Sequence, residues 1–321
     1  MIDFSMVSRR RALELGLCAA APFVLPPWAA AAPLSYRIEP KPIADGVWLI
    51  EGAAAPITIE NGGAIANIVI FDTSEGAVLI DSGPSHAYGE ALKATASALT
   101  GKPVARVYLT HIHADHVLGA TAFPADAVWT TPTLAADLRA RGAGLTDAMY
   151  RAVGDWMRGS TTPEPGRDVS GEREDVGDRR FRFLPLAGHS GSDLCLFEEC
   201  SGLLIAGDLV FLDRAPTTPD ADLERWRASL ATIEGAGGKL LVPGHGPAEA
   251  GSRGVAQTRA WLAMIEERIG DGFERGLDIG ELTASPLPAW AERMAASRYE
   301  FARSVMHLLP RLEAEKLPVV S

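Results

Sequence analysis

The sequence predicts an α/β fold (α+β in some schemes) in which β-sheets lie between layers of helices. Short apolar, β-rich runs alternate with helix-like segments, and this alternation occurs in two successive halves of the chain. The 321 residues are 47% hydrophobic and 22% charged, which is ordinary for a globular protein with a filled core. The formal net charge of −11 argues against a nucleic-acid partner, because a general nucleic-acid binder would present a basic face.

Residues 1–31 have the layout of a bacterial export signal. Ser8–Arg11 precede a modest apolar run that ends in small residues at 29–32. The paired arginines favour the twin-arginine route, so we expect a periplasmic protein with no stable membrane anchor after cleavage. A membrane anchor or a disordered tail is the alternative, but prolines such as Pro22 interrupt the apolar run and shorten it.

The first half of the remaining chain predicts strands and helices in alternation. The stretch at 66–83 is typical of two strands joined by a turn at Gly76, and 87–101 has helical spacing with a glycine stop. The run at 103–111 predicts a buried strand. Further helices are expected at 132–141 and 145–158, followed by a loop at 159–180 that resembles a flexible lid or a surface excursion.

The second half repeats the alternation and then becomes helical. Strands are expected at 181–189, 193–199, 202–211 and 239–245, with a helix around 221–234 and helical segments from about 254, including 289–315. Cys195 and Cys200 are the only cysteines after the predicted signal. Their spacing leaves open whether they form a disulfide, because geometry decides that.

Polar residues close several of the apolar runs. The stretch "THIHADH" follows "VYL", and single polar residues follow four other runs; the residues concerned are His111, His113, Asp115, His116, His189, His245, Asp208 and Asp81. We expect them to converge at one sheet edge, where functional sites of layered folds commonly form. Imidazole and carboxylate ligands suit zinc, iron or manganese, and the absence of thiolates argues against a closed structural zinc site. The ligands suffice for two ions with open positions, which indicates catalysis.

The motifs "LIDSG", "THIHADH", "GHS", "AGD" and "PGHG", in this order and spacing, resemble the metallo-β-lactamase superfamily. The resemblance implies an αββα sandwich over 33–268 with a helical C-terminal extension at 269–321 packed on it. It also implies a pair of zinc ions, and it distributes the ligands between them. One metal would be held by His111, His113 and His189, the second by Asp115, His116 and His245, with Asp208 bridging the two and Asp81 fixing the histidine loop through hydrogen bonds.

Asp208 narrows the chemistry further. The β-lactamases of the superfamily usually have Cys or Ser at this position, whereas aspartate resembles the glyoxalase-II-like and lactonase-like hydrolases. A carboxylate between two cations offsets their repulsion, and a water that the cations share would ionise near neutral pH and attack an ester, thioester, lactone or amide. Asp115 would orient that nucleophile or receive its proton, so Asp115 and Asp208 are the predicted catalytic residues. We expect any β-lactamase activity to be minor.

Three stretches, at 150–160, 206–226 and 299–313, are similar to the quinoprotein relay system zinc metallohydrolases. This resemblance implies a role beside a dehydrogenase that depends on pyrroloquinoline quinone (PQQ). We expect Arg214 to bind an anionic substrate group, with a surface ion pair as the alternative. Trp156 is a second candidate for substrate binding, although packing in the core is slightly favoured for it.

Two other readings of the same residues remain open. His111, His189 and Asp208 alone would suit a mononuclear iron enzyme resembling the persulfide dioxygenases. A non-catalytic factor that binds a quinone, a metal or a dehydrogenase is the other alternative. His86 and His307 have no motif around them, so we expect them to be surface or packing residues.

Overall fold

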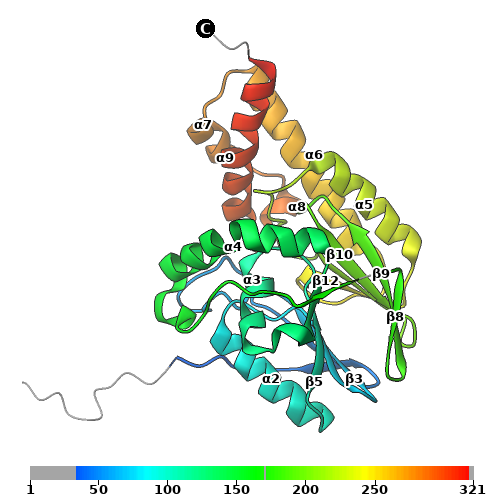
Figure 1. The fold of residues 1–321 in the computed structure, drawn as a ribbon. Helices are drawn as coiled ribbons and strands as arrows, with labels where there is room; N and C mark the ends of the chain where they lie inside the picture. Colours follow the sequence, from blue (N-terminus) through cyan, green and yellow to red (C-terminus); the bar gives the residue numbers. More distant parts are fainter. Residues whose placement is uncertain (1–33, 170, 318–321) are drawn as a thin grey trace, which may run out of the picture. The chain divides into compact units, whose positions relative to one another are not determined.

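The computed structural model describes residues 34–169 and 171–317, so the predicted signal at 1–31 lies outside the described residues. Two β-sheets form the centre of the fold (Figure 1). The first sheet has seven strands within the described residues, in sequence order: β1 (Lys41–Ala44), β2 (Val47–Ile50), β3 (Ile68–Thr73), β4 (Gly76–Ile80), β5 (Val104–Tyr108), β6 (Val128–Thr130) and β7 (Arg167–Asp168). Strands β1 to β4 pair antiparallel, and β4 to β7 pair parallel.

The second sheet has five strands in the described part of the chain. Its order is β12 (Leu240–His245), β11 (Leu203–Phe211), β10 (Asp193–Glu198), β9 (Arg179–Leu186) and β8 (Arg173–Val176). Strands β11 and β12 are parallel, and the other pairs are antiparallel. Each β-rich run of the sequence therefore becomes a strand, and the Gly76 turn joins β3 to β4 as predicted.

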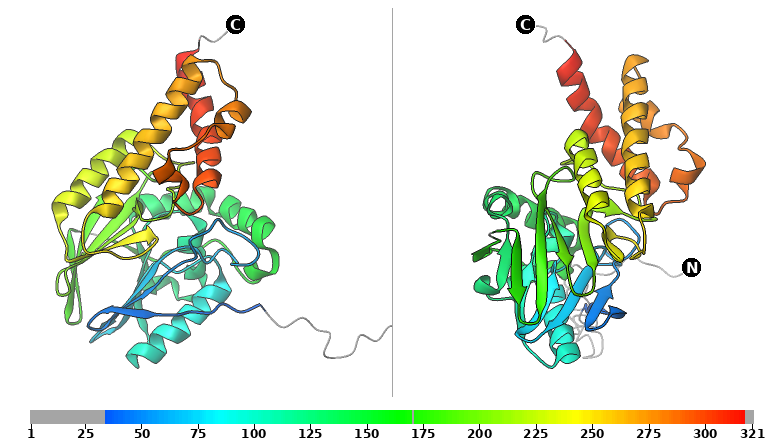
Figure 2. Two further views of the ribbon diagram at one scale, coloured as in Figure 1. Left: turned by 180° about the vertical axis from the view of Figure 1, so that it is seen from behind. Right: turned by 90° about the vertical axis from the view of Figure 1, so that its right-hand side faces the viewer.

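The two sheets pack face to face, with helices on their outer faces (Figure 2). Side chains alternate along the strands: Val69 and Phe71 of β3 face the second sheet, whereas Ile68 and Ile70 face the helices. The first sheet is covered by α2 (His86–Thr100) and α4 (Pro132–Val153), and the second by α5 (Leu223–Ala236) and α6 (Arg253–Glu274). The predicted αββα sandwich is confirmed.

Local signals explain where α2 begins and ends. The Ser85 side chain accepts a hydrogen bond from the Tyr88 amide, and Gly101 ends the helix with a left-handed φ of 69°. The two helices expected at 132–141 and 145–158 are instead one, because α4 runs unbroken to Val153 and a short 3-10 helix, η4 (Gly154–Met157), follows it. A Cβ at Gly142 would lie 2.2 Å from Thr162, so this glycine permits close packing and does not end the helix.

The C-terminal region is helical, as predicted, and consists of α6, α7 (Ile279–Ala284), α8 (Ala289–Glu292) and α9 (Ser297–Lys316). In Figures 1 and 2, α6 and α9 extend together beyond the sheets. The single helix expected over 289–315 is broken at Ala296, which has a φ of 57°. The break follows from a backbone bridge: the Ala295 amide donates to Asp213 at 2.9 Å, and the Ala215 amide donates to Ala295 at 3.0 Å. This bridge fixes the start of α9 beside the end of β11.

The cysteines are not joined. Cys195 is buried in β10 and its thiol contacts the Ala206 carbonyl at 3.3 Å, whereas Cys200 is exposed beyond the strand. No helix in the part of the chain that the structure describes combines the length and the hydropathy needed to cross a bilayer.

Candidate metal centre

The candidate site begins with the short loop that follows β5. His111 and His113 lie on this loop, and Asp115 and His116 lie on α3 (Ala114–Val117), a single helical turn. His189 follows β9, and His245 is the last residue of β12. The loop and three further strands therefore deliver their polar side chains to one place.

Asp208 follows the apolar run of β11 but does not end the strand, which continues to Phe211 in agreement with the strand expected at 202–211. The pairing of β11 with β12 shifts register on both sides of Gly207, whose φ is 52°. Such a bulge reorients the next side chain. On the neighbouring strand, a Cβ at Gly244 would lie 1.9 Å from Asp208 Oδ1, so the glycine before His245 makes room for this carboxylate.

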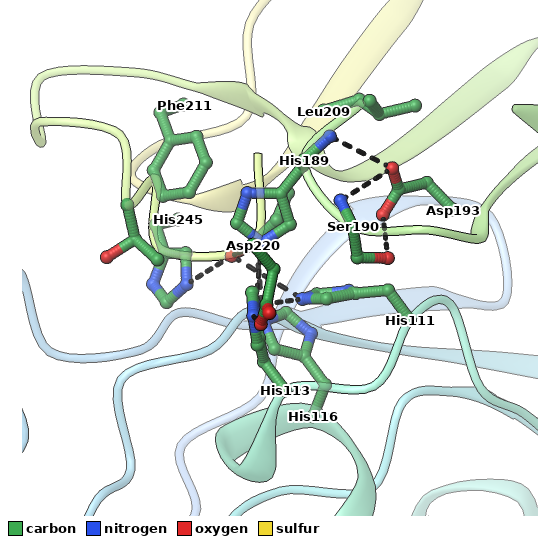
Figure 3. A network of polar contacts seen from close by, with 12 residues as sticks. His111, His113, His116, His189, Ser190, Asp193, Leu209, Phe211, Asp220 and His245 are labelled. Carbon is green, nitrogen blue, oxygen red and sulfur yellow. Dashed lines mark hydrogen bonds and ion pairs between the residues drawn. The ribbon is translucent and has the colours of Figure 1, made fainter. Parts of the chain in front are cut away.

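The seven predicted ligands form two adjoining groups, shown in part in Figure 3. We call them together the ligand cluster. The first group is His111, His113, His189 and Asp208, and the second is Asp115, His116 and His245; within each group, one ligand atom per residue lies within 4.8 Å of the others. The division is the one that the resemblance implied.

Ring nitrogens of the first group converge. His113 Nδ1 lies 3.1 Å from His111 Nε2 and 2.7 Å from His189 Nε2. Asp208 adjoins both groups: its Oδ2 lies 3.3 Å from His189 Nε2 and 3.2 Å from His245 Nε2, and its Oδ1 lies 3.1 Å from His116 Nε2. One carboxylate is thus shared by histidines of the two groups.

The arrangement fits a pair of metal ions. His116 Nε2 and Asp208 Oδ1 are both buried and close together, yet neither has a hydrogen-bond partner among the described residues. Buried polar atoms are normally paired, so two such atoms directed into one cluster indicate a group that both of them bind. Imidazole nitrogens and carboxylate oxygens are ligands for zinc, iron or manganese.

The protonation states also suit cations. Burial lowers the pKa of His111 and His189 well below the usual value, which leaves neutral imidazoles with a free lone pair. Burial would raise the pKa of Asp208, but the surrounding histidines outweigh it and hold that pKa well below the usual value. Burial would lower the pKa of His116, but Asp208, Asp115 and Asp81 raise it well above the usual value.

Asp81 supports the cluster from the sheet side. Its carboxylate accepts hydrogen bonds from the Thr110 amide and hydroxyl, each at 2.8 Å, and from His116 Nδ1 at 2.7 Å. The Thr110 hydroxyl in turn lies 2.9 Å from His111 Nδ1, and since it donates to Asp81 it accepts from that ring. Both histidines therefore carry their proton on Nδ1 and direct Nε2 into the cluster. Asp81 has a φ of 65°, a conformation that aspartate tolerates better than most residues.

Asp193 holds the loop that carries His189. It accepts hydrogen bonds from the amides of His189 and Ser190, at 3.1 and 3.0 Å, and from the Ser190 hydroxyl at 2.8 Å (Figure 3). Burial raises its pKa to about 7, against the lowering effect of these hydrogen bonds.

Asp220 supports the opposite side of the cluster, and the sequence analysis did not identify it. Its Oδ2 accepts from His113 Nε2 at 3.1 Å, and its Oδ1 accepts from Arg141 at 3.0 Å. The hydrogen bond from His113 contributes most to a pKa of Asp220 far below the usual range. The only sequence signal was its position in the 206–226 stretch, where nothing distinguished it from its neighbours.

A cavity of about 410 Å³ opens on the ligand cluster, and we call it the substrate cavity. Four ligands reach it: His113, Asp115, Asp208 and His245. Residues of α4 and α9 form parts of its wall, and the segment 214–220 contributes Arg214, Thr217, Pro219 and Asp220. The loop at 159–180, expected as a flexible lid or a surface excursion, contributes no described residue to this wall and contains β7 and β8.

The remaining candidates have mixed outcomes. Arg214 lines the cavity and pairs with Glu300 at 3.0 Å; because this pair is buried, the alternative of a surface ion pair is wrong, and the expected binding of an anionic substrate group stays a prediction. Trp156 lies outside the cavity, packs on Tyr36 with ring centroids 4.4 Å apart, and donates to the Ile59 carbonyl at 2.7 Å. These contacts agree with the packing that was slightly favoured for Trp156, and a place for it in substrate binding stays a prediction.

The two histidines without motifs also differ. His86 begins α2 and its ring contacts Thr121 at 3.3 Å, which agrees with a packing role. His307 is exposed on α9, as expected for a surface residue, and it also lines the substrate cavity. Its place in the 299–313 stretch did not indicate this second position.

Comparisons with known proteins agree with this geometry. The profile of the Metallo-beta-lactamase superfamily matches residues 61–245. An atrochrysone carboxyl ACP thioesterase of Aspergillus fumigatus is 29% identical over 184 residues, which are 56% of this chain and 50% of that protein. The acyl-coenzyme A thioesterase MBLAC2 of Homo sapiens is 26% identical over 195 residues, covering 53% of this chain and 66% of that protein. The chain thus spans only about half to two thirds of the length of these curated relatives.

Solved structures show the same fold. A metallo-beta-lactamase from Pontibacter korlensis superposes with a TM-score of 0.57 at 22% identity, covering 71% of this chain and 99% of the other. A sec-alkylsulfatase from a Pseudomonas species gives a TM-score of 0.62 at 16% identity, covering 88% of this chain and 52% of the other. The superfamily match at 61–245 spans more than half of the chain and includes every residue of the ligand cluster, so the chain belongs to the metallo-beta-lactamase superfamily.

Proposed function

We propose that the protein is a binuclear metal-dependent hydrolase that acts on a small ester or thioester. The observation that carries the proposal is the position of Asp208, whose carboxylate lies 3.1–3.3 Å from histidines of both ligand groups. Two ligand groups that share one carboxylate suit a pair of cations better than a single ion. The thioesterases among the relatives support an acyl substrate.

The metals that we propose are two zinc ions per chain, with iron or manganese as alternatives for the same ligands. When bound, such ions polarise a carbonyl and make water nucleophilic at neutral pH. The chain itself contributes the geometry. Asp208 offsets the charge of the ions, and Asp115, which lines the cavity, orients a water molecule and accepts its proton at the carboxylate. The fixed Nδ1 protons of His111 and His116 keep their lone pairs directed into the cluster.

We also propose export by the twin-arginine route to the periplasm and a role accessory to a PQQ-dependent dehydrogenase. The support is the Ser8–Arg11 stretch and the resemblance of three segments to the quinoprotein relay hydrolases. Replacing Arg9 and Arg10 by lysine should retain the protein in the cytoplasmic fraction of expressing cells. Unchanged secretion of that variant would contradict the route.

The first test of the hydrolase is metal content together with turnover. Elemental analysis of the full chain, purified without added metal, should give close to two zinc ions per chain, and a chelator should abolish thioester hydrolysis. His245→Gln should lose metal, whereas the matched control His86→Gln, outside the ligand cluster, should keep it. A single iron per chain with oxygen consumption would overturn the proposal in favour of the mononuclear oxygenase. Two zinc ions without turnover on any ester, thioester or lactone would favour the non-catalytic factor.

A further inference from the structure

The substrate cavity has one apolar wall. Leu145, Ala148, Met149 and Ala152 of α4 line it, at the spacing that places four residues on one face of a helix. Ile57 and Ile65 continue this surface. These six residues carry no charge, so this side of the cavity suits an aliphatic or aromatic part of a substrate.

Another part of the wall is polar and comes from α9. Tyr299, Arg303 and His307 follow one another at intervals of four residues, so they form a single stripe along this helix. The Arg303 guanidinium lies 5.6 Å from the centre of the Tyr299 ring. The cavity wall therefore combines an apolar side from α4 with a cationic side from α9, and four metal ligands belong to the same wall.

The charge of the cationic side is not balanced within the described residues. Glu300 is fully buried and is shared by two arginines: its Oε1 accepts from Arg214 at 3.0 Å and its Oε2 accepts from Arg303 at 3.1 Å. One carboxylate cannot neutralise two guanidinium groups. Asp220, the nearest other acidic side chain in the wall outside the ligand cluster, is already paired with Arg141 and His113. One positive charge thus remains beside the cavity.

The two arginines also keep donors that no described residue uses. Arg214 Nε is buried and has no hydrogen-bond partner in the described chain. Arg303 is 31% exposed, and all its hydrogen bonds among the described residues come from Nη1, to Thr217 at 2.9 Å and to Glu300. Guanidinium groups with free donors in a cavity wall bind carboxylates well, because their planar forks match that geometry.

We propose that the substrate is an ester or thioester that carries a carboxylate, with this carboxylate bound at Arg303 and the apolar part of the molecule against α4. This inference rests on the proposed hydrolase, because it assigns a substrate class to the same cavity. A volume of about 410 Å³ limits the bound portion to a small acyl compound. Arg303 provides the charge, and Glu300 with Thr217 holds its guanidinium in place.

The test compares two thioesters that differ in one group. The zinc-loaded full chain is assayed with S-glutaryl-N-acetylcysteamine and with the analogue whose carboxylate is replaced by a carboxamide. The protein should prefer the carboxylate by about tenfold or more in kcat/KM. Arg303→Gln should reduce this ratio to near unity, and Arg303→Lys, which retains the charge, should retain part of it. Glu300 keeps Arg214 as a partner in both variants, and a thermal melt checks that they fold.

The matched control is Arg298→Gln, which removes a guanidinium from the same helix outside the cavity, where it pairs with Glu292. That variant should keep the preference of the unmodified protein. A ratio near unity in the unmodified protein, or an unchanged ratio in Arg303→Gln, would overturn the inference.

Failure of the proposed hydrolase would be recognised separately. If the unmodified protein hydrolyses neither thioester, the hydrolase proposal fails. Calorimetry then measures the affinity of the protein for glutarate and for its monoamide, and so tests the carboxylate site at Arg303 without any need for turnover. Glutarate should then bind more tightly than the monoamide, and Arg303→Gln should remove the difference. Equal binding of the two compounds by the unmodified protein would contradict the anion site.

Discussion

The two ligand groups are supported by carboxylates in very different surroundings. Asp81, behind the second group, has a side chain that is 3% exposed, and its partner His116 is fully buried. Asp220, beside the first group, has a side chain that is 34% exposed, and its partner His113 is 15% exposed. The carboxylate that supports the second group is therefore part of the protein interior, whereas the one that supports the first group lies at the substrate cavity, although ligands of both groups reach that cavity.

This difference separates two tasks. A buried carboxylate held by the Thr110 amide and hydroxyl fixes ligand geometry before any ion binds. Asp220, whose side chain is about one-third exposed, also binds Arg141 of α4 and so connects the ligand His113 with a helix that lines the substrate cavity. We expect substitutions at the buried support to affect metal affinity and stability together, and substitutions at the exposed support to have smaller effects.

The largest effect is expected at Asp208, which the two groups share. Asp208→Asn keeps the size of the side chain but removes the charge that offsets two cations. We expect kcat/KM for a thioester to fall by about 10³-fold or more, since several kcal/mol of charge stabilisation are lost. Elemental analysis should show fewer than two metals per chain. Full metal content with an unchanged rate would show that the groups do not depend on a shared carboxylate.

A smaller effect, confined to the second group, is expected for Asp81→Asn. Asparagine tolerates the left-handed φ of 65° at this position, so the change tests the charge and the hydrogen bonds without adding backbone strain. Affinity for one of the two metals should fall by about 10- to 100-fold. The free energy of unfolding of the metal-free protein should fall by about 1–3 kcal/mol, because buried hydrogen bonds are lost.

Titration against a competing chelator measures the affinity for each of the two metal ions, and thermal unfolding of the metal-free protein measures its stability. If both affinities fell equally, the two groups would be coupled through the loop that follows β5, and the contrast between a buried and an exposed support would not hold.

The sequence predicted the fold and the ligand cluster because both depend on local signals. Alternation along the strands and helical spacing identify the layers, and the loop after β5 carries four ligands in six positions, His111 to His116. Local signals also misled at α4, where two helices were expected, at 132–141 and 145–158, and one helix runs through Gly142. Packing against Thr162 decides that position, and no pattern within the helix records it.

The cavity wall could not be predicted in this way. Arg214 and Glu300 meet although 86 residues separate them, and Asp220 meets His113 across 107 residues. The Arg214–Glu300 contact depends on the backbone bridge at Ala295, which places α9 beside the end of β11. The cavity wall therefore depends on tertiary contacts, whereas four of the seven ligands come from one short motif.

The smallest effect is expected for Asp220→Asn. The amide oxygen can still accept a hydrogen bond from His113 Nε2 or from Arg141, but the negative charge that Asp220 presents to both is lost. Because Asp220 is one-third exposed, solvent screens much of its interaction, and we expect metal affinity at the first group to fall by only about three- to tenfold. The chelator titration used for Asp81→Asn measures this loss, which should affect the metal at the first group and not the metal at the second group.

A loss as large as that of Asp81→Asn would mean that Asp220 fixes His113 as firmly as Asp81 fixes His116, in spite of its exposure. A loss of substrate preference without any change in metal affinity would instead assign Asp220 to the cavity wall, where its partner Arg141 belongs to α4.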